Sequence, residues 1–489
     1  MRTTRALLPV MALAAAGLSL LPCREAKASE TTRVASSFEE DNPFDLHFGV
    51  GYNFQFTQGA VLRELPGGSG NQLAKDLVYQ KYRHTVNVGM EIGLYRRLSV
   101  YAELPIVVQD TRNYGFDQRA DGCTFPDDVS ALNPGDINCV NKTNSSTLRD
   151  GIVPRNGFDA RSTSNPYGQY DGEDTELIFN GPARRGIDQI HVGLKYGILS
   201  QDVWSHLPNW VLAFEGRFAV GAPMRFSRDI QVSEPSSNRV VGRGIHELGL
   251  WTALSRRYRY LEPFFGAHWR QSLAASGSEF DAPSNSEDTN PMSEVGFYFG
   301  TEIVPWERKT KKQKVALIFS GAAQLRYNGR EYSEVWELLA DSPALVGANN
   351  PAAQQCNEQA SVGYAAENPE AQDYLEQANA AGGSGGCFRF NGITNVDNYA
   401  VFSGRFALDF HLGKYARLML GTQVGTTTQH FLTSANRGEP TRAGDPDIVD
   451  PDTADVNPLY RDVVDNVGRR YAIDDLIDVN AFLDFLVTF

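Results

Sequence analysis

The chain has 489 residues, a formal net charge of -14, 42% hydrophobic residues and a mean hydropathy of -0.35. These values exclude a membrane protein built of apolar helices, and the acidic charge argues against nucleic acid as a partner. Length alone would suggest about three soluble domains, so the class of protein has to be read from the pattern along the chain.

The first 28 residues have the form of an export signal. Arg2 and Arg5 precede an apolar run over 6–21, and Ala26 and Ala28 flank Lys27 in the pattern that signal peptidase accepts. We predict a signal peptide at 1–28, a periplasmic segment at 29–43 and a membrane domain at 44–489.

The first segment after position 43 alternates strictly in polarity. Every even position from Phe44 to Phe56 is apolar, and every odd position from Asp45 to Thr57 is polar or glycine. Soluble sandwiches rarely sustain such an alternation with aromatic residues at both ends, whereas a strand that faces lipid on one side does. The pattern therefore favours a transmembrane β-barrel.

Eleven further segments show the same alternation, which gives about twelve strands. The expected fold is all-β, an antiparallel up-and-down barrel with an even strand number, although a weak hairpin between 110 and 186 would raise the number to fourteen. The predicted strands are 44–57, 82–94, 98–108, 187–198, 210–220, 245–254, 261–271, 293–303, 315–327, 399–412, 415–424 and 477–489.

The connections alternate between short and long, as expected of periplasmic turns and external loops. The longest predicted loops are 109–186, 328–398 and 425–476. The short turns are basic and include Arg96, Arg97, Arg257, Lys314 and Lys414, which either face anionic phospholipid or are simply solvated turn residues.

If the apolar face of each strand meets lipid, the opposite face lines the lumen. Its charges could fill a barrel of intermediate width, or line a narrow path for small polar solutes. The predicted lumen residues include Glu91, Glu103, Lys195, Glu215, Arg217, Glu247, His268, Arg270, Glu294, Glu302, Arg326, Arg405, Asp409 and Arg417.

The long loops carry four cysteines and an acidic run. Pairing within each loop, Cys123 with Cys139 and Cys356 with Cys387, is the simplest of three connectivities. The acidic run could offer oxygen ligands to calcium but lacks the glycine turn and glutamate of an EF-hand, so no cofactor is firmly expected. Its aspartates are Asp445, Asp447, Asp450 and Asp452.

Two loop segments have helical patterns, and two His–Ser pairs allow an enzyme to be considered. Val335, Trp336, Leu338 and Leu339 have helical spacing, as does a segment beginning at Asn368; both could cap the barrel or merely decorate its surface.

His268 with Ser272, and His430 with Ser434, are four residues apart, which is about 13 Å in a strand. We therefore expect no hydrolase activity.

The last segment has alternating apolar residues at Leu483, Phe485, Val487 and Phe489. It resembles the C-terminal signature of bacterial outer-membrane barrels. The resemblance implies that this strand is recognised by the barrel assembly machinery, and that the protein lies in the outer membrane of a Gram-negative bacterium, in contact with lipid and lipopolysaccharide.

A second resemblance covers about a quarter of the chain. The residues that carry it are Gly93-Leu94, Arg97-Leu98, Leu104-Pro105, Gly186, Asp188 and Gly193 to Tyr196. The two stretches that contain them are similar to a transporter-like outer-membrane family associated with the meta-pathway of phenol degradation, which implies hydrophobic or aromatic cargo.

These observations predict a monomeric channel or facilitator for passive movement of small molecules. The alternative is a closed barrel that serves as a scaffold or adhesion platform through its external loops. A channel requires a continuous water path, whereas a scaffold should have paired lumen charges and a sealed mouth.

Overall fold

A computed structural model describes most of the chain. The described residues are 30–38, 44–67, 70–117, 139–142, 144–154, 157–159, 177–201, 203–226, 238–280, 286, 289–345, 390–442, 448–449, 455 and 457–489. The predicted signal peptide therefore lies outside the described residues.

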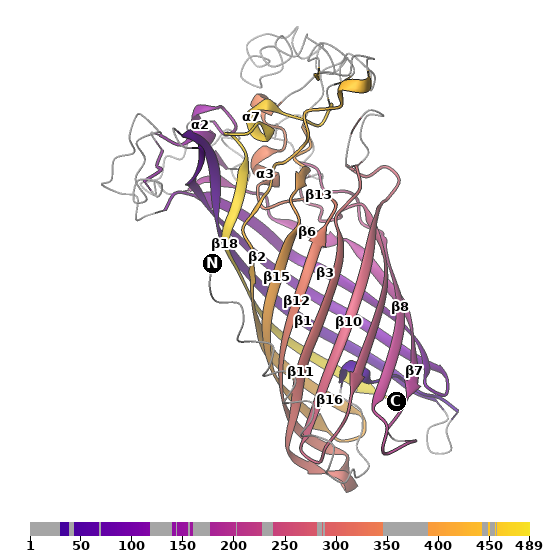
Figure 1. Ribbon diagram of the computed structural model, residues 1–489. Helices are drawn as coiled ribbons and strands as arrows, with labels where there is room; N and C mark the ends of the chain where they lie inside the picture. The colour runs from indigo at the N-terminus through magenta and orange to yellow at the C-terminus, as the bar shows by residue number, and fades with distance from the viewer. Residues whose placement is uncertain are drawn as a thin grey trace.

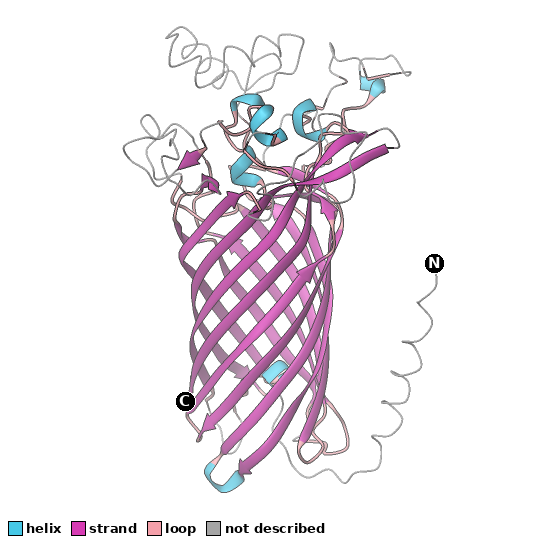
Figure 2. Ribbon diagram, turned by 90° about the vertical axis from the view of Figure 1, so that its left-hand side faces the viewer, coloured by secondary structure: helices cyan, strands magenta, loops and turns pink. Residues whose placement is uncertain are grey.

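Sixteen strands form one sheet, and twelve of these close into an antiparallel barrel (Figures 1 and 2). Neighbours in sequence pair all the way round, and the last strand pairs with the first over a long register, His47 with Thr488 through Arg63 with Tyr471. The predicted fold class and strand number are confirmed. The fourteen-strand alternative is wrong, because the strands between 115 and 187 are short pieces at the outer end.

All twelve predicted strands are present. In order around the barrel they are β1 (Leu46–Gly67), β2 (Gly70–Tyr95), β3 (Leu98–Gly115), β7 (Gln189–Leu199), β8 (Asn209–Ala219), β9 (Ile245–Ser255), β10 (Leu261–Ala274), β11 (Ser293–Arg308), β12 (Gln313–Tyr327), β15 (Tyr399–Leu412), β16 (Ala416–Thr427) and β18 (Tyr471–Thr488).

Short elements gather at the two ends. A 3-10 helix, η1 (Glu30–Thr32), lies inside the barrel near its inner end in both views, and η5 (Lys309–Lys311) forms a turn. The outer end carries β4 (Phe158–Asp159), β5 (Leu177–Asn180), β6 (Arg184–Ile187), β13 (Gly329–Glu331), β14 (Thr394–Val396), β17 (His430–Phe431), α2 (Ser146–Arg149), α3 (Trp336–Leu339), η6 (Pro343–Leu345), η7 (Pro440–Arg442) and α7 (Asp462–Asp465). No described helix has the length and apolarity needed to cross a bilayer.

The outer wall of the barrel is apolar. Phe48, Phe265, Phe299, Phe406 and Phe485 are each at least 37% exposed, although a soluble protein would bury such side chains. Exposed aromatic residues also ring the end with the short turns: Tyr95, Tyr196, Trp204, Trp210, Tyr260, Trp306, Tyr415 and Phe489. A closed barrel with an apolar band and an aromatic girdle spans a membrane.

Several strands are longer than their alternation predicts. The expected loop 58–81 is instead a continuation of β1 and β2, and β18 begins at Tyr471 within the expected loop 425–476. Val61, Arg63, Glu64 and Leu65 are all buried, on both faces of β1. Here the hairpin has left the membrane and is covered by protein on both sides, so the period of two disappears.

Two predicted turn residues do not lie on the surface. Arg257 is buried and forms an ion pair with Glu307 at 3.0 Å. Lys314 is buried and pairs with Glu302. The expectation that these two face phospholipid is wrong, because each neutralises an acid at the inner rim.

Candidate functional site: the lumen and its two ends

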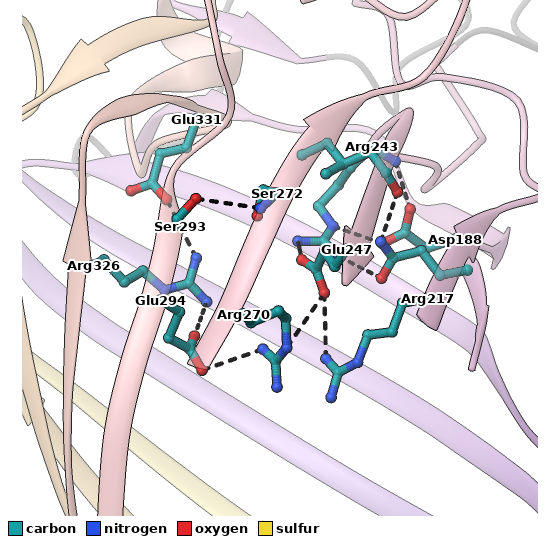
Figure 3. A network of polar contacts seen from close by, with 12 residues as sticks. Asp188, Arg217, Arg243, Glu247, Arg270, Ser272, Ser293, Glu294, Arg326 and Glu331 are labelled. Carbon is teal, nitrogen blue, oxygen red and sulfur yellow. Dashed lines mark hydrogen bonds and ion pairs between the residues drawn. The ribbon is translucent and has the colours of Figure 1, made fainter. Parts of the chain in front are cut away.

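A row of alternating charges crosses the outer part of the lumen (Figure 3). Arg243 binds Asp188 at 2.6 Å and Glu247 at 3.4 Å, and Arg270 lies 3.8 Å from Glu247. The row continues from Arg270 to Glu294 at 3.2 Å, then to Arg326 at 3.2 Å and Glu331 at 3.5 Å. We call these seven residues the charge ladder. Each member has opposite charges as neighbours, so the ladder is largely neutralised from within.

A branch extends the charge ladder deeper into the barrel. Arg217 binds Glu215 at 2.6 Å and reaches Glu247 at 3.5 Å, and the hydroxyl of Tyr101 donates to Glu215 at 2.5 Å. His268 adds a 2.8 Å contact to Glu294. The strand pattern had already indicated lumen residues in the ladder and its branch: Glu215, Arg217, Glu247, His268, Arg270, Glu294 and Arg326.

Three members of the charge ladder were not predicted as lumen residues. Asp188 and Arg243 lie just outside strands, and Glu331 lies in β13, so period-two alternation does not place them. Asp188 belonged to the motif behind the second resemblance. Its carboxylate holds Arg243, and its carbonyl accepts from Val220 and Gly221 at 3.1 and 3.2 Å, which gives the motif aspartate a structural role.

A second charged layer lies at the inner end. Arg417 binds Asp409 through two nitrogens at 2.6 and 3.0 Å, and His411 contacts the same carboxylate at 3.0 Å. On another part of the wall, Lys195 binds Glu91 at 3.0 Å. Glu103 lies between these strands, with His191 opposite it in the register.

Residues 30–38, here called the inner segment, cross the lumen at this end. The Thr32 hydroxyl lies 2.7 Å from that of Ser255 in β9, while the backbone of Ala35 donates to Glu91 of β2 at 3.0 Å. Ala35 is completely buried. The segment thus joins walls four strands apart. The sequence predicted a periplasmic segment at 29–43; in the structure, hydrogen bonds to the wall hold Thr32 and Ala35 of this segment within the inner end of the barrel.

External segments cover the other end. The external cap comprises residues 139–142, 144–154, 333–345, 390–396 and 457–470, together with the outer ends of the neighbouring strands. One apolar cluster within it includes Trp336, Ile245 of β9 and Ile473 of β18. Strands β9 and β18 face each other in the ring of twelve, so this cluster reaches both sides of the mouth.

The helix α3 is held by charge as well as by apolar packing. Arg184 donates to Glu337 at 2.5 Å, and Arg112 lies 3.5 Å from the same oxygen. Both guanidinium groups also lie over the ring of Trp336, at 4.8 and 5.4 Å. The helix was predicted, with its role left open between a cap and a surface decoration. The side chains of α3 are completely buried, so it is part of the cap.

Apolar side chains also face inward, which the expectation of a polar lumen missed. Between the two charged layers lies an apolar patch composed of Phe264, Tyr298, Ile318, Ala407, Met419 and Phe482. Inward aromatic rings rest on glycines of adjacent strands: a Cβ on Gly193 would lie 2.5 Å from Tyr101, and one on Gly421 would lie 2.6 Å from Phe482. Glycines alternating with inward aromatic residues are the sequence signal that could have revealed this.

The other predicted sites are only partly within the described residues. Cys139 is buried and disulfide-bonded, but Cys123, Cys356 and Cys387 lie outside, so the pairing stays a prediction. Asp445, Asp447, Asp450 and Asp452, and the segment from Asn368, also lie outside. Among described residues, no group of three or more His, Cys, Asp or Glu side chains is placed to hold a metal ion.

The two His–Ser pairs have other bonding partners. His268 contacts Glu294, and His430 contacts the carbonyl of Thr428 at 2.8 Å. The Ser434 hydroxyl donates to the carbonyl of Asn395 at 3.0 Å. These contacts do not orient either histidine as a base for its serine.

No family model and no curated protein matches the chain. Among solved structures it is similar to an outer membrane channel of Pseudomonas putida F1, at 7% identity and a TM-score of 0.40, covering 95% of this chain and 100% of that one. A FadL homologue of Pseudomonas aeruginosa gives 6% identity, 91% and 90% coverage and a TM-score of 0.28. OmpT, an outer membrane protein of Vibrio cholerae, has 7% identity and a TM-score of 0.25, and the match covers 90% of this chain and 98% of that one.

Similarity this distant does not bear on function. The closed barrel, its apolar band and its aromatic girdle are those of a Gram-negative outer-membrane protein. What the barrel does has to be argued from its lumen.

Proposed function

We propose that the protein is an outer-membrane channel for passive movement of small solutes, closed in this conformation by its own chain at both ends. The observation that supports this most is an unfilled middle of the lumen. Ser320, Ala322, Ser403, Arg405 and Gln423 face inward yet are only half-buried. A barrel packed as a rigid core would bury such side chains.

The two closures involve segments other than the transmembrane strands. The inner segment is held by a few hydrogen bonds, and the external cap by apolar packing and the Glu337 ion pairs. The inner segment or the external cap can move out of the lumen without breaking the backbone hydrogen bonds between the strands of the barrel wall. A wall that stays intact while its ends open is the arrangement expected of a gated channel.

A closed scaffold is the second candidate. The pairing within the charge ladder and the apolar cluster across the mouth both favour it. In that case the external loops would bind a partner or the saccharide layer, and the half-buried middle of the lumen would have no role.

Planar-bilayer recordings distinguish the two. We expect rare, short current steps from the wild-type protein, and steady ohmic steps from a variant that lacks residues 30–38 and carries Glu337→Gln. Folding is verified for each sample by its heat-modifiable gel shift. Silence of the folded double variant would reject the channel and favour the scaffold.

A further inference from the structure

Arg405 of β15 differs from the other arginines that face the lumen. Arg217, Arg270, Arg326 and Arg417 each have a carboxylate within 4.0 Å. Arg405 instead contacts the sulfur of Met419 at 3.3 Å and lies 4.5 Å from the centre of the Phe482 ring. In the part of the chain that the structure describes, no carboxylate lies within ion-pair distance of it.

The inward neighbours of Arg405 explain why it has no acidic partner. Ser320 of β12 and Gln423 of β16 lie directly opposite it in the register. The remaining neighbours on its own strand and on the diagonals are also uncharged, and most are small: Ser403, Ala407, Ile318, Ala322, Gly421 and Gly425. The described side chains that face the lumen around the guanidinium therefore include none that could form an ion pair with it.

The apolar patch adjoins this cation. Met419 and Phe482 contact Arg405 and also belong to the patch with Phe264, Ile318 and Tyr298. Hydroxyl and amide groups of Ser320 and Gln423 flank the other side. A positive charge, hydrogen-bonding groups and an apolar surface thus meet at one depth of the lumen.

We propose that Arg405 and the apolar patch bind an organic anion that carries a compact apolar group, such as an aromatic monocarboxylate. The planar guanidinium offers two parallel donors to a carboxylate, and the patch offers aromatic and aliphatic surface to the ring. A half-buried cation with no acid beside it gains more from an anion than one already paired in the charge ladder. This site rests on the proposed function, because the ligand has to reach the lumen.

The test measures binding rather than current. Benzoate, acetate and benzyl alcohol are titrated by calorimetry into the folded full chain in detergent, for wild type, Arg405→Gln, Arg405→Lys and the control Arg83→Gln. Arg83 lies in β2 and, unlike Arg405, has an acidic partner, Asp110, at 3.7 Å. Partition of each probe into micelles is the same for all four proteins and cancels in the comparison.

We expect benzoate to bind wild type and Arg83→Gln equally, and to bind Arg405→Gln at least about tenfold more weakly, since the variant loses the charge-assisted hydrogen bonds to the carboxylate. Arg405→Lys should recover part of the affinity, because it restores the charge without the planar pair of donors. Acetate and benzyl alcohol should each bind more weakly than benzoate.

Three results would overturn the proposal: no benzoate binding to folded wild type, equal binding to Arg405→Gln, or equal affinity for benzoate and acetate. The last would leave only a simple anion site. If benzoate binds but the double variant passes no current, the channel is rejected and the Arg405 site is supported. If the double variant passes current but benzoate does not bind, the site is rejected and the channel is supported.

Discussion

At the scale of single residues, Glu337 joins two arginines that belong to different strands. Arg112 extends from β3 and Arg184 from β6, and the carboxylate between them is completely buried. Removing this shared charge deprives two buried guanidinium groups of an acidic partner. The outer closure should therefore be sensitive to this one carboxyl group.

Glu337→Gln should destabilise the external cap by about 3 kcal/mol, the lower end of the cost of breaking a buried ion pair. The readout is the urea dependence of the fluorescence that Trp336 contributes, taken as the difference from Trp336→Phe. Glu279→Gln is the matched control, because its partner Arg225 has a side chain that is 63% exposed. The control should change stability by less than about 1 kcal/mol; equal effects would contradict the role given to Glu337.

Asp465 of α7 makes the stability of the external cap depend on pH. Burial raises the pKa of this carboxyl to about 7, against hydrogen bonds from the backbones of Arg461 and Ala435 and the charges of Arg461 and Arg330. The folded cap therefore holds a proton that the unfolded chain releases near pH 4. Its stabilising effect is complete below about pH 4 and is lost as the pH rises towards 7.

We expect the urea midpoint of the cap to fall between about pH 4 and 7 and to level off above. Asp465→Asn should flatten this dependence, since the amide does not titrate. A midpoint that rises with pH in the wild type, or an unchanged slope in Asp465→Asn, would contradict the assignment.

At the scale of elements, the strands show which parts of the fold a sequence can predict. Lipid on one side and a lumen on the other impose a period of two, so every membrane strand was found from alternation. The outer ends of β1 and β18 were missed because protein covers both faces there, as the burial of Arg63 and Glu64 shows. The predicted α3 was correct as a helix, but its burial depends on distant arginines.

The inward glycines provide a prediction about strand packing. Gly193→Ala should cost about 1–3 kcal/mol, because its Cβ would lie 2.5 Å from the Tyr101 ring, which also bonds Glu215. Gly404→Ala is the control, since a Cβ there meets nothing within 4 Å. The temperature of the heat-modifiable gel shift should fall for Gly193→Ala alone, and equal shifts would refute the packing argument.

At the scale of the whole molecule, the lumen has three levels: the charge ladder, a middle in which Arg405 lies among uncharged neighbours, and an inner charged layer crossed by the inner segment. Individual lumen residues such as Glu215 and Arg217 could be predicted from alternation. Their connection into a ladder could not, because it depends on the register between strands and on Asp188, Arg243 and Glu331, which do not follow the alternation. The apolar patch was missed because a polar lumen was assumed.

Two closures in series lead to a prediction about open probability. If they act independently, a solute passes only while both are open, so the open probability is the product of the two. Deletion of residues 30–38 alone, or Glu337→Gln alone, should each raise the open probability modestly in planar bilayers. The double variant should show the product of the two increases. An effect of either single change as large as that of the double would mean that only one closure exists.

The external cap is closed by one shared apolar core, which has a thermal consequence. Opening it would transfer buried side chains such as Trp336, Phe179 and Leu339 into water, so the opening equilibrium should have a positive heat-capacity change. Such an equilibrium is curved in temperature, with a point of greatest closure and easier opening on either side of it. The outer end of this barrel would then respond to warming as a small globular domain does, and the membrane strands beneath it would not.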